Sequence, residues 1–310
     1  MKFTMHPGPW PDVIDEVVAA GHTYVTDPAE AKFLIYNGGR AEGGADGLPS
    51  PLPESIGFIQ YPFAGVDHLI DSGLIKPGVR WANAGGVYGR PVAEIALSLL
   101  LSQLHQVKAA AMAGSFRDRG ELDARQGWLF HDTTVALIGA GGIGRELIKL
   151  LEPFGVHVIA VNRSGREVPG ADETYPMDRA GHVWSRADHF VLTAPLTEDT
   201  RGMVDAGVLA KMKPDTVLVN VGRGQLVVTD DLVTALQNGT IAGAAMDVVD
   251  PEPLPDGHPL WQLPNATILP HIAATGRIAR LLVAPQIIEN AAAFERGERM
   301  PTEVDAEAGY

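Results

Sequence analysis

The chain has 310 residues, which suits two domains of ordinary size. Hydrophobic residues make up 45% and charged residues 20% of it, a composition that argues against a disordered chain and against a membrane protein. The formal net charge of −14 would repel phosphate backbones, so nucleic acid is not an expected partner. The lack of cysteine excludes disulfides, cysteine-ligated zinc, iron–sulfur clusters and thiolate nucleophiles. The N-terminus lacks a basic start followed by an apolar run, so we expect a cytoplasmic protein.

Short apolar runs alternate with helical patterns over the N-terminal part of the chain. Residues 12–20 fit a helix, and residues 33–36, 56–60 and 79–83 fit strands. This alternation predicts a small α/β unit. Gly and Pro dominate residues 37–53, which we predict to be a surface loop.

The middle of the chain repeats a strand, a glycine and a helix. Residues 92–112 carry apolar side chains at helical spacing after Pro91, which predicts one helix ending near Gly114. Near-continuous apolar strands, typical of a sheet covered on both faces, follow at residues 134–138, 156–161, 189–193, 217–221, 241–247 and 267–269. We therefore predict a parallel, doubly wound sheet, followed by a last helix over residues 278–296.

Two glycine-containing junctions, residues 85–89 and 274–276, bracket this central unit. We therefore predict a smaller domain built from residues 1–88 and 276–310 around a larger domain of residues 89–275. The alternative is two domains in simple succession.

A glycine-rich loop joins the first strand of the central unit to its first helix. Gly139 permits a sharp turn, Gly141 lets the backbone approach a pyrophosphate, and Gly144 lets the helix pack closely on the strand. The phosphate would lie at the helix N-terminus, beside Gly142 and Ile143. This context predicts a dinucleotide-binding loop, and the alternative is a purely structural glycine turn.

The end of the second strand bears on the choice of dinucleotide. NAD-selective sites carry Asp or Glu about 20 residues after the glycines, to bind the ribose 2′-hydroxyl. Here the strand is followed by Asn162, Arg163 and Ser164, with Arg166 nearby. A guanidinium suits a 2′-phosphate, so we predict NADP(H) as the cofactor. Use of NAD(H) stays open, because Asn162 can bind a free hydroxyl and surface arginines are often only solvated.

Three further segments end predicted strands, where ligands bind in open α/β sheets. They are NVGRG with Arg223, DVVDPEP with Asp247 and Glu252, and LPHIAA with His271. Together with the glycine loop, they resemble the D-2-hydroxyacid dehydrogenase family, whose motifs also resemble residues 63–67, 91–94 and 304–310 of this chain.

The resemblance covers nearly the whole chain. It implies two doubly wound parallel-sheet, Rossmann-like α/β domains separated by a cleft, the smaller of them discontinuous in sequence. Residues 1–88 and 276–310 would then form the substrate domain, and residues 89–275 the dinucleotide-binding domain.

The three polar side chains suffice for hydride transfer to a 2-keto acid. His271 would act as general acid, Glu252 would favour and orient its imidazolium, and Arg223 would bind the substrate carboxylate and polarise the carbonyl. Each residue alone has an ordinary alternative, such as a surface histidine or an arginine in a glycine turn.

The resemblance also implies supporting contacts. Backbone N–H groups of Ala64, Gly65 and Val66 would help to bind the substrate carboxylate. Asp247 would bind the nicotinamide carboxamide or, alternatively, cap its own turn. The remaining implied cofactor contacts are Pro195, Thr200, Val221 and Ala273. We expect no metal.

Within the family, the short chain and the segment from Asn162 to Ser164 look most like NADPH-dependent glyoxylate/hydroxypyruvate reductases. We therefore expect reduction of a small 2-keto acid to the D-2-hydroxy acid by a homodimer paired through the helix of residues 92–112. The alternative is a nucleotide-sensing, corepressor-like binding protein on the same fold. A Rossmann methyltransferase would leave Arg223, Glu252 and His271 unexplained.

Overall fold

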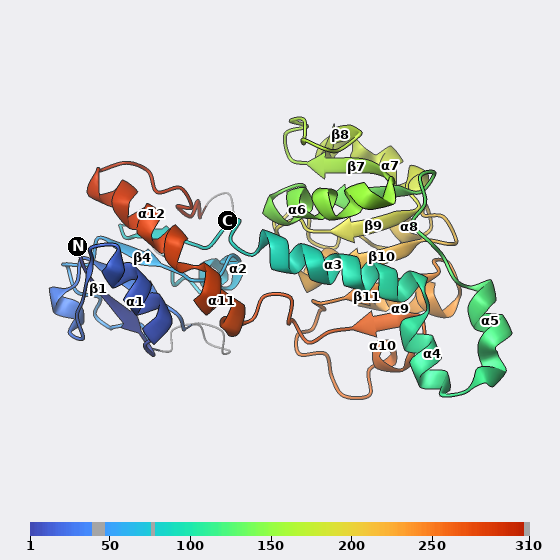
Figure 1. Ribbon diagram of the computed structural model, residues 1–310, viewed down its shortest axis with the longest axis horizontal. Helices are drawn as coiled ribbons and strands as arrows, with labels where there is room; N and C mark the ends of the chain where they lie inside the picture. The colour runs from blue at the N-terminus through green and yellow to red at the C-terminus, as the bar shows by residue number, and fades with distance from the viewer. Residues whose placement is uncertain (39–46, 76–77, 307–310) are drawn as a thin grey trace. The chain divides into compact units, whose positions relative to one another are not determined.

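The computed structural model describes residues 1–38, 47–75 and 78–306. Residues 39–46 of the predicted surface loop and residues 307–310 of the tail lie outside the described residues. The chain divides into two compact units (Figure 1). Unit 1 comprises Met1–Tyr88 with Ala274–Tyr310, and unit 2 comprises Gly89–Ala273. Over the described ranges, no helix combines the length and apolar character needed to cross a bilayer.

The described part of unit 1 contains a five-stranded parallel sheet in the order β2-β1-β3-β4-β5. Its strands are β1 (Lys2–His6), β2 (Thr23–Tyr24), β3 (Phe33–Tyr36), β4 (Phe58–Gln60) and β5 (Arg80–Ala82). Its helices are α1 (Pro11–Ala19), α2 (Asp67–Asp71), α11 (Gly276–Leu282) and α12 (Ala284–Glu295). Helix α1 packs on α12, so the C-terminal segment completes this unit.

The described part of unit 2 contains a seven-stranded parallel sheet in the order β12-β11-β10-β9-β6-β7-β8. Its strands are β6 (Thr134–Ile138), β7 (His157–Asn162), β8 (Glu173–Pro176), β9 (His189–Leu192), β10 (Val217–Asn220), β11 (Gly243–Met246) and β12 (Ala266–Ile268). The chain runs from β6 towards β7 and later returns to β9 on the other side of β6. The strand order therefore reverses between β6 and β9, where a doubly wound sheet binds ligands at its carboxyl edge.

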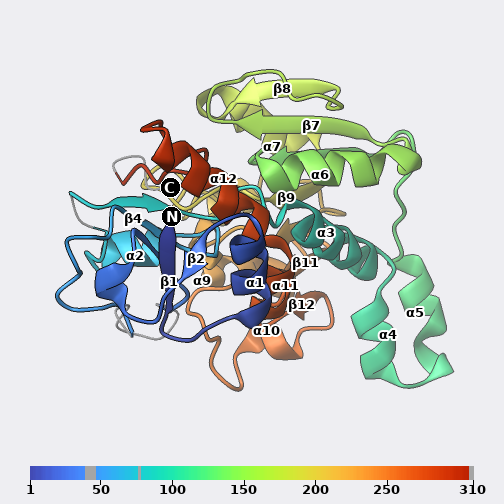
Figure 2. The ribbon, with the colours of Figure 1, turned by 60° about the vertical axis from the view of Figure 1, so that its left-hand side comes forward.

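Helices surround the sheet of unit 2. They are α3 (Gly89–Leu104), α4 (Val107–Ala113), α5 (Arg119–Ala124), α6 (Gly142–Leu151), α7 (Val183–Arg186), α8 (Ala206–Leu209), α9 (Thr229–Gln237) and α10 (Pro259–Gln262). Helices α3 and α6 lie side by side, and α4 and α5 project away from the sheet (Figures 1 and 2). The parallel pairing and the reversal of the strand order confirm the predicted parallel, doubly wound sheet. Its inner strands are buried, as predicted from their near-continuous apolar runs.

Two predicted helices are each interrupted. The helix predicted over residues 92–112 is wrong, because α3 ends at Leu104 and Gln106 adopts a left-handed φ of 56° before α4 begins. The Gln106 side chain donates to the Gln103 carbonyl at 3.0 Å and so satisfies a carbonyl at the end of α3. The helix predicted over residues 278–296 is also two helices, since Pro285 in the first turn of α12 lacks the N–H that a continuous helix needs.

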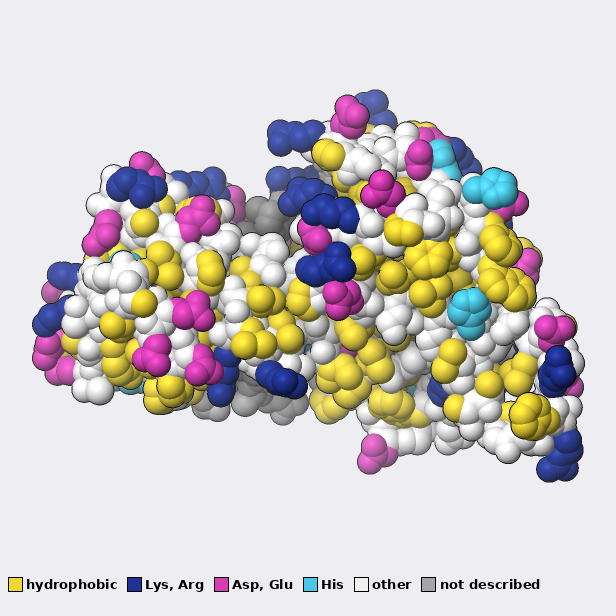
Figure 3. Space-filling view, viewed as in Figure 1, with side chains coloured by type: hydrophobic (Ala, Val, Ile, Leu, Met, Phe, Trp, Pro, Cys, Tyr) yellow, Lys and Arg dark blue, Asp and Glu magenta, His cyan; other side chains and the backbone are white. Residues whose placement is uncertain are grey.

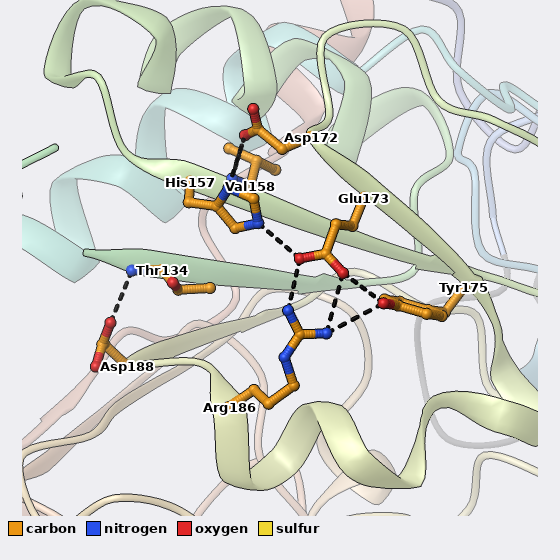
Figure 4. Close-up of polar contacts among 8 residues, drawn as sticks. All are labelled: Thr134, His157, Val158, Asp172, Glu173, Tyr175, Arg186 and Asp188. Atoms are coloured by element: carbon orange, nitrogen blue, oxygen red, sulfur yellow. Dashed lines mark hydrogen bonds and ion pairs between the residues drawn. The ribbon is translucent and has the colours of Figure 1, made fainter. Parts of the chain in front are cut away.

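A polar cluster fixes the outer strand β8 to its neighbours, at the edge of the sheet where the strands begin (Figure 4). The Glu173 carboxylate accepts hydrogen bonds from Arg186 at 2.6 and 3.0 Å, from Tyr175 and from His157 at 2.8 Å. The bonds from Arg186, followed by those from Tyr175 and His157, lower the pKa of Glu173 to about 2. This cluster lies at the opposite edge from the ends of β6 and β9.

Candidate active site

The glycine loop follows β6, at the point where the strand order reverses. Gly139 has a φ of +101°, and a Cβ there would lie 2.4 Å from the backbone nitrogen of Ala194. Only glycine fits this turn, because a side chain would be strained and would collide with backbone. The Thr193 hydroxyl donates to the Gly139 carbonyl, which ties the loop to the end of β9.

The next glycines differ in the space around them. A Cβ on Gly144 would lie 2.8 Å from the Gly139 carbonyl oxygen, so α6 packs directly on the turn. A Cβ on Gly141 would meet nothing within 4 Å, so there is open space at the N-cap of α6. Gly142 and Ile143 begin the helix and are partly exposed. Open space at the positive end of a ten-residue helix fits the pyrophosphate of a dinucleotide.

The turn after β7 is shaped by the amide of Asn162. Its Nδ2 donates to the Arg166 carbonyl at 2.7 Å, and its Oδ1 accepts the Ser164 N–H at 3.1 Å. Arg163, Ser164 and Arg166 are exposed on this turn. The turn thus presents guanidinium and hydroxyl groups in a place where NAD-selective sites hold a carboxylate.

Arg223 lies in a turn organised by the buried Asn220 at the end of β10. The Asn220 Oδ1 accepts the Gly222 N–H at 3.0 Å, and its Nδ2 donates to the Arg223 carbonyl at 2.8 Å. A Cβ on Gly224 would lie 1.9 Å from the Val249 carbonyl oxygen, so glycine alone lets this turn lie against the segment that follows β11. The segment carrying Arg223 is thereby held beside the segment that leads to Glu252.

His271 lies in a turn fixed by Asp247, which follows β11 and is 2% exposed. The His271 N–H donates to the Asp247 carbonyl at 2.9 Å, and the Asp247 carboxylate accepts the N–H groups of Ile272 at 2.9 Å and Ala273 at 3.2 Å. His271 itself has a left-handed φ of 51°. Asp247 therefore stabilises a backbone conformation that is uncommon for any residue other than glycine. The structure supports the capping alternative for Asp247, and its contact with a carboxamide stays a prediction.

The imidazole and the carboxylate predicted to act together are hydrogen-bonded. The His271 Nδ1 lies 2.6 Å from the Glu252 Oε1, and because a carboxylate only accepts, Nδ1 carries the proton. Burial raises the pKa of Glu252, but the bond and charge of His271, a backbone bond at Val249 and the charge of Arg223 hold this pKa below the usual value of a glutamate. Glu252 is thus an anion at neutral pH, and Arg223 is close enough to act on it.

The other predicted cofactor residues lie in the same unit. Pro195 and Thr200 belong to one loop after β9, and the Thr200 hydroxyl donates to the Pro195 carbonyl at 2.8 Å. The Val221 N–H donates to the Leu192 carbonyl at 3.1 Å, and Ala273 is buried. These residues form hydrogen bonds or are buried within their own chain, and their contacts with a cofactor stay predictions.

The predicted substrate loop, residues 63–67, belongs to unit 1 and follows β4. Ala64 is exposed, Gly65 is partly exposed, and Val66 is buried. The backbone of Ala64 and Gly65 is therefore accessible, while Val66 packs inward, and the contact of this loop with a substrate stays a prediction.

Asn220 and Thr193 shape the turns around the predicted residues but were not themselves predicted from the sequence. Each is a polar residue at or just after the end of a buried strand, directly following a run of apolar side chains. That position is the signal that could have found them. The partners of Asn220 are local in sequence, whereas the bond of Thr193 to Gly139 follows only from the packing of neighbouring strands.

Known proteins resemble this chain over most of its length. The family model described as "D-isomer specific 2-hydroxyacid dehydrogenase, NAD binding domain" matches residues 95–273. A Corynebacterium melassecola protein described as "Uncharacterized protein in proB 3′region" is 50% identical over all of both chains. The human "Glyoxylate reductase/hydroxypyruvate reductase" is 34% identical over 77% of this chain and 74% of its own.

A solved structure shares the fold. The NADPH-dependent glyoxylate/hydroxypyruvate reductase of Sinorhizobium meliloti, in complex with NADP and sulfate, superimposes with a TM-score of 0.80. It is 26% identical, and the match covers 100% of this chain and 99% of that one. With the family model covering more than half of the sequence, the chain belongs to the D-isomer-specific 2-hydroxyacid dehydrogenase family.

Proposed function

We propose that this enzyme reduces a small 2-keto acid to the D-2-hydroxy acid with NADPH, with glyoxylate and hydroxypyruvate as the favoured substrates. The proposal rests on the 2.6 Å hydrogen bond between His271 and Glu252 at the carboxyl edge of the sheet. The positive charge of Arg223 acts on Glu252 in the same place. The names of the human relative and of the Sinorhizobium structure support the substrate class.

The dinucleotide would supply the hydride that reaches the carbonyl carbon. Because Nδ1 of His271 is bonded to Glu252, its Nε2 is the nitrogen that gives a proton to the carbonyl oxygen. The negative charge of Glu252 stabilises the imidazolium before this transfer. Arg223 binds the substrate carboxylate and stabilises the negative charge that develops on the carbonyl oxygen.

The glycine loop and the turn after β7 would bind the cofactor. Open space at Gly141 and the first amides of α6 suit the pyrophosphate. The exposed Arg163, Ser164 and Arg166 suit a 2′-phosphate, so we propose that NADPH is preferred over NADH. The larger domain is accordingly proposed to bind the dinucleotide and the smaller one the substrate. The cytoplasmic location stays a prediction.

A single assay tests the reaction. We expect the purified chain to consume NADPH, followed by its absorbance, with glyoxylate or hydroxypyruvate and less well with bulkier 2-keto acids. Binding of NADPH without turnover of any 2-keto acid would contradict the proposal and favour the nucleotide-sensing alternative, which the reductase names of the relatives do not favour.

The cofactor preference is measured in the same assay. We expect kcat/KM to be higher with NADPH than with NADH, and Arg163→Ala to lower this ratio about tenfold, because a charge-assisted contact to the 2′-phosphate is lost. Lys211→Ala, which removes an exposed cation elsewhere on unit 2, should leave the ratio unchanged. A clear preference of the unaltered enzyme for NADH would refute the proposed preference for NADPH.

We also propose a homodimer formed through α3 and the projecting helices. Leu97, Leu101 and Val107 line a hollow of about 550 Å³ on this face, where hydrophobic side chains gather (Figure 3). Met112 in α4 and Phe116 between α4 and α5 are 54% and 94% exposed. Apolar surface of this kind is typical of an interface with a second copy. Sedimentation should give twice the chain mass, and a species of 33.0 kDa would contradict the proposal.

A further inference from the structure

The substrate loop is held through consecutive backbone carbonyl groups. The Pro62 carbonyl accepts the Tyr88 hydroxyl, and the Phe63 carbonyl accepts the Ala84 N–H at 3.0 Å. The Ala64 carbonyl accepts the side-chain Nδ2 of Asn83 at 2.8 Å. All three donors belong to the segment that follows β5, so these three carbonyl groups point towards one side of the loop.

The N–H groups of the same peptides point the other way. In a trans peptide the N–H is directed opposite to the C=O. The Ala64 and Gly65 N–H groups therefore face away from the segment after β5. Across the described residues, neither N–H has a hydrogen-bond acceptor in its own chain. Two neighbouring N–H groups on one side can donate together to one anion, and the exposure of Ala64 and Gly65 lets a ligand reach them.

Asn83 is itself fixed from several directions and is only 8% exposed. Its Oδ1 accepts the Gly85 N–H at 2.9 Å, and its own N–H donates to the Thr302 carbonyl at 3.0 Å. Its carbonyl accepts Gln60 Nε2 at 2.9 Å and the Thr302 hydroxyl at 2.6 Å. The buried Asn290 bonds both Gln60 and Thr302. Rotation of the Asn83 side chain would leave its own buried amide without partners, while the bonds of its backbone hold the residue in place, so the amide is a rigid support for the Ala64 carbonyl.

We propose that Asn83 is a positioning residue that sets the affinity for the substrate carboxylate by fixing the peptide between Ala64 and Gly65. Asn83 acts through this peptide and not by touching the substrate. The inference rests on the proposed function, since it takes a 2-keto acid carboxylate as the anion bound by the loop.

Two substitutions remove the donor to Ala64. Asn83→Asp keeps the shape and the acceptor for Gly85 but sets an oxygen against the Ala64 carbonyl, and Asn83→Ala removes the donor without adding charge. We expect each to raise KM for glyoxylate about tenfold, while kcat and KM for NADPH change little, because the carboxylate contact is the same in the ground and transition states. The affinity for oxalate, measured by calorimetry on the NADP-bound enzyme, should fall by the same factor.

Thr302→Val is the matched control. It removes the bonds that the Thr302 hydroxyl forms with Asn83 and Asn290. The Asn83 side chain stays bonded to Ala64 and Gly85, and its backbone stays bonded to the Thr302 carbonyl and to Gln60. We expect it to lower Tm and to leave KM for glyoxylate and the oxalate affinity unchanged.

The outcomes separate the two proposals. If the unaltered enzyme reduces glyoxylate while both folded Asn83 variants keep its KM, this inference alone is overturned. An equal rise of KM in Thr302→Val also overturns it, because general destabilisation would then explain the effect. If the unaltered enzyme reduces no 2-keto acid, the proposed function fails and the inference fails with it.

Discussion

His271→Gln is expected to lower kcat for 2-keto acid reduction by about 10³-fold, the usual size of a general-acid contribution. Glutamine can still hydrogen-bond to Glu252, but it has no proton to give at neutral pH. The turn around Arg223 and the glycine loop do not depend on the imidazole, so KM for the keto acid and for NADPH should change little. Initial rates of NADPH consumption measure all three constants.

Two further substitutions test whether the effect comes from proton transfer. Glu252→Gln keeps a hydrogen-bond acceptor beside His271 but removes the charge that favours the imidazolium, so we expect a smaller loss of about tenfold in kcat. His131→Gln makes the same histidine change at an exposed position before β6 and should leave kcat unaltered. If His271→Gln keeps more than a tenth of the activity, the assignment of the general acid is wrong.

The sheet of unit 2 could be predicted from sequence because its signals are local. The strand from Thr134 to Ile138 is a nearly continuous apolar run that leads directly into the glycines, and a pattern of this kind is typical of a strand in a sheet covered by helices on both faces. The positions of Arg223 and His271 followed from the same rule, since each comes after an apolar run and the carboxyl ends of parallel strands lie at one edge.

Elements without a local apolar signal were missed. Strand β8 is half-buried, and its Glu173 is paired with Arg186, so the segment has the composition of a loop. The break between α3 and α4 was missed for the opposite reason, because apolar side chains continue at helical spacing through Gln106. Asp247 was found from sequence, but its bond to Ala273 was not, and Asn83 was missed altogether, because its bond to Ala64 joins residues far apart in the sequence.

The stability of the enzyme is expected to fall between neutral pH and pH 5 because of one buried histidine. His189 on β9 is 6% exposed and accepts the Val217 N–H on the neighbouring strand at 3.2 Å. Burial, with a smaller effect from the charge of Lys213, lowers its pKa to about 4, and the charges of Asp188 and Asp215 do not offset this. His189 is therefore neutral in the folded chain throughout this pH range.

The sign of the effect follows from the protons bound in each state. In the unfolded chain the pKa of His189 returns to about 6.5, so below this pH the unfolded state binds a proton that the folded state does not. The contribution of neutral His189 to the stability of the folded chain is therefore complete above pH 6.5 and is lost as the pH falls towards 4. Between pH 7.5 and pH 5 the free energy of unfolding should decrease by about 2 kcal/mol from this group alone. Glu173, whose pKa is lowered to about 2, affects the free energy of unfolding mainly at lower pH.

His189→Asn isolates this contribution. The asparagine Oδ1 can accept the Val217 N–H in place of Nδ1 but does not titrate, so the variant should lose about 2 kcal/mol less between pH 7.5 and pH 5 than the unaltered enzyme. Urea unfolding at both pH values gives the four free energies required. His6 and His22, whose pKa values are also lowered by burial, contribute equally to both proteins and cancel in the comparison. Equal pH dependence in the two proteins would mean that His189 is solvated or already protonated in the folded state.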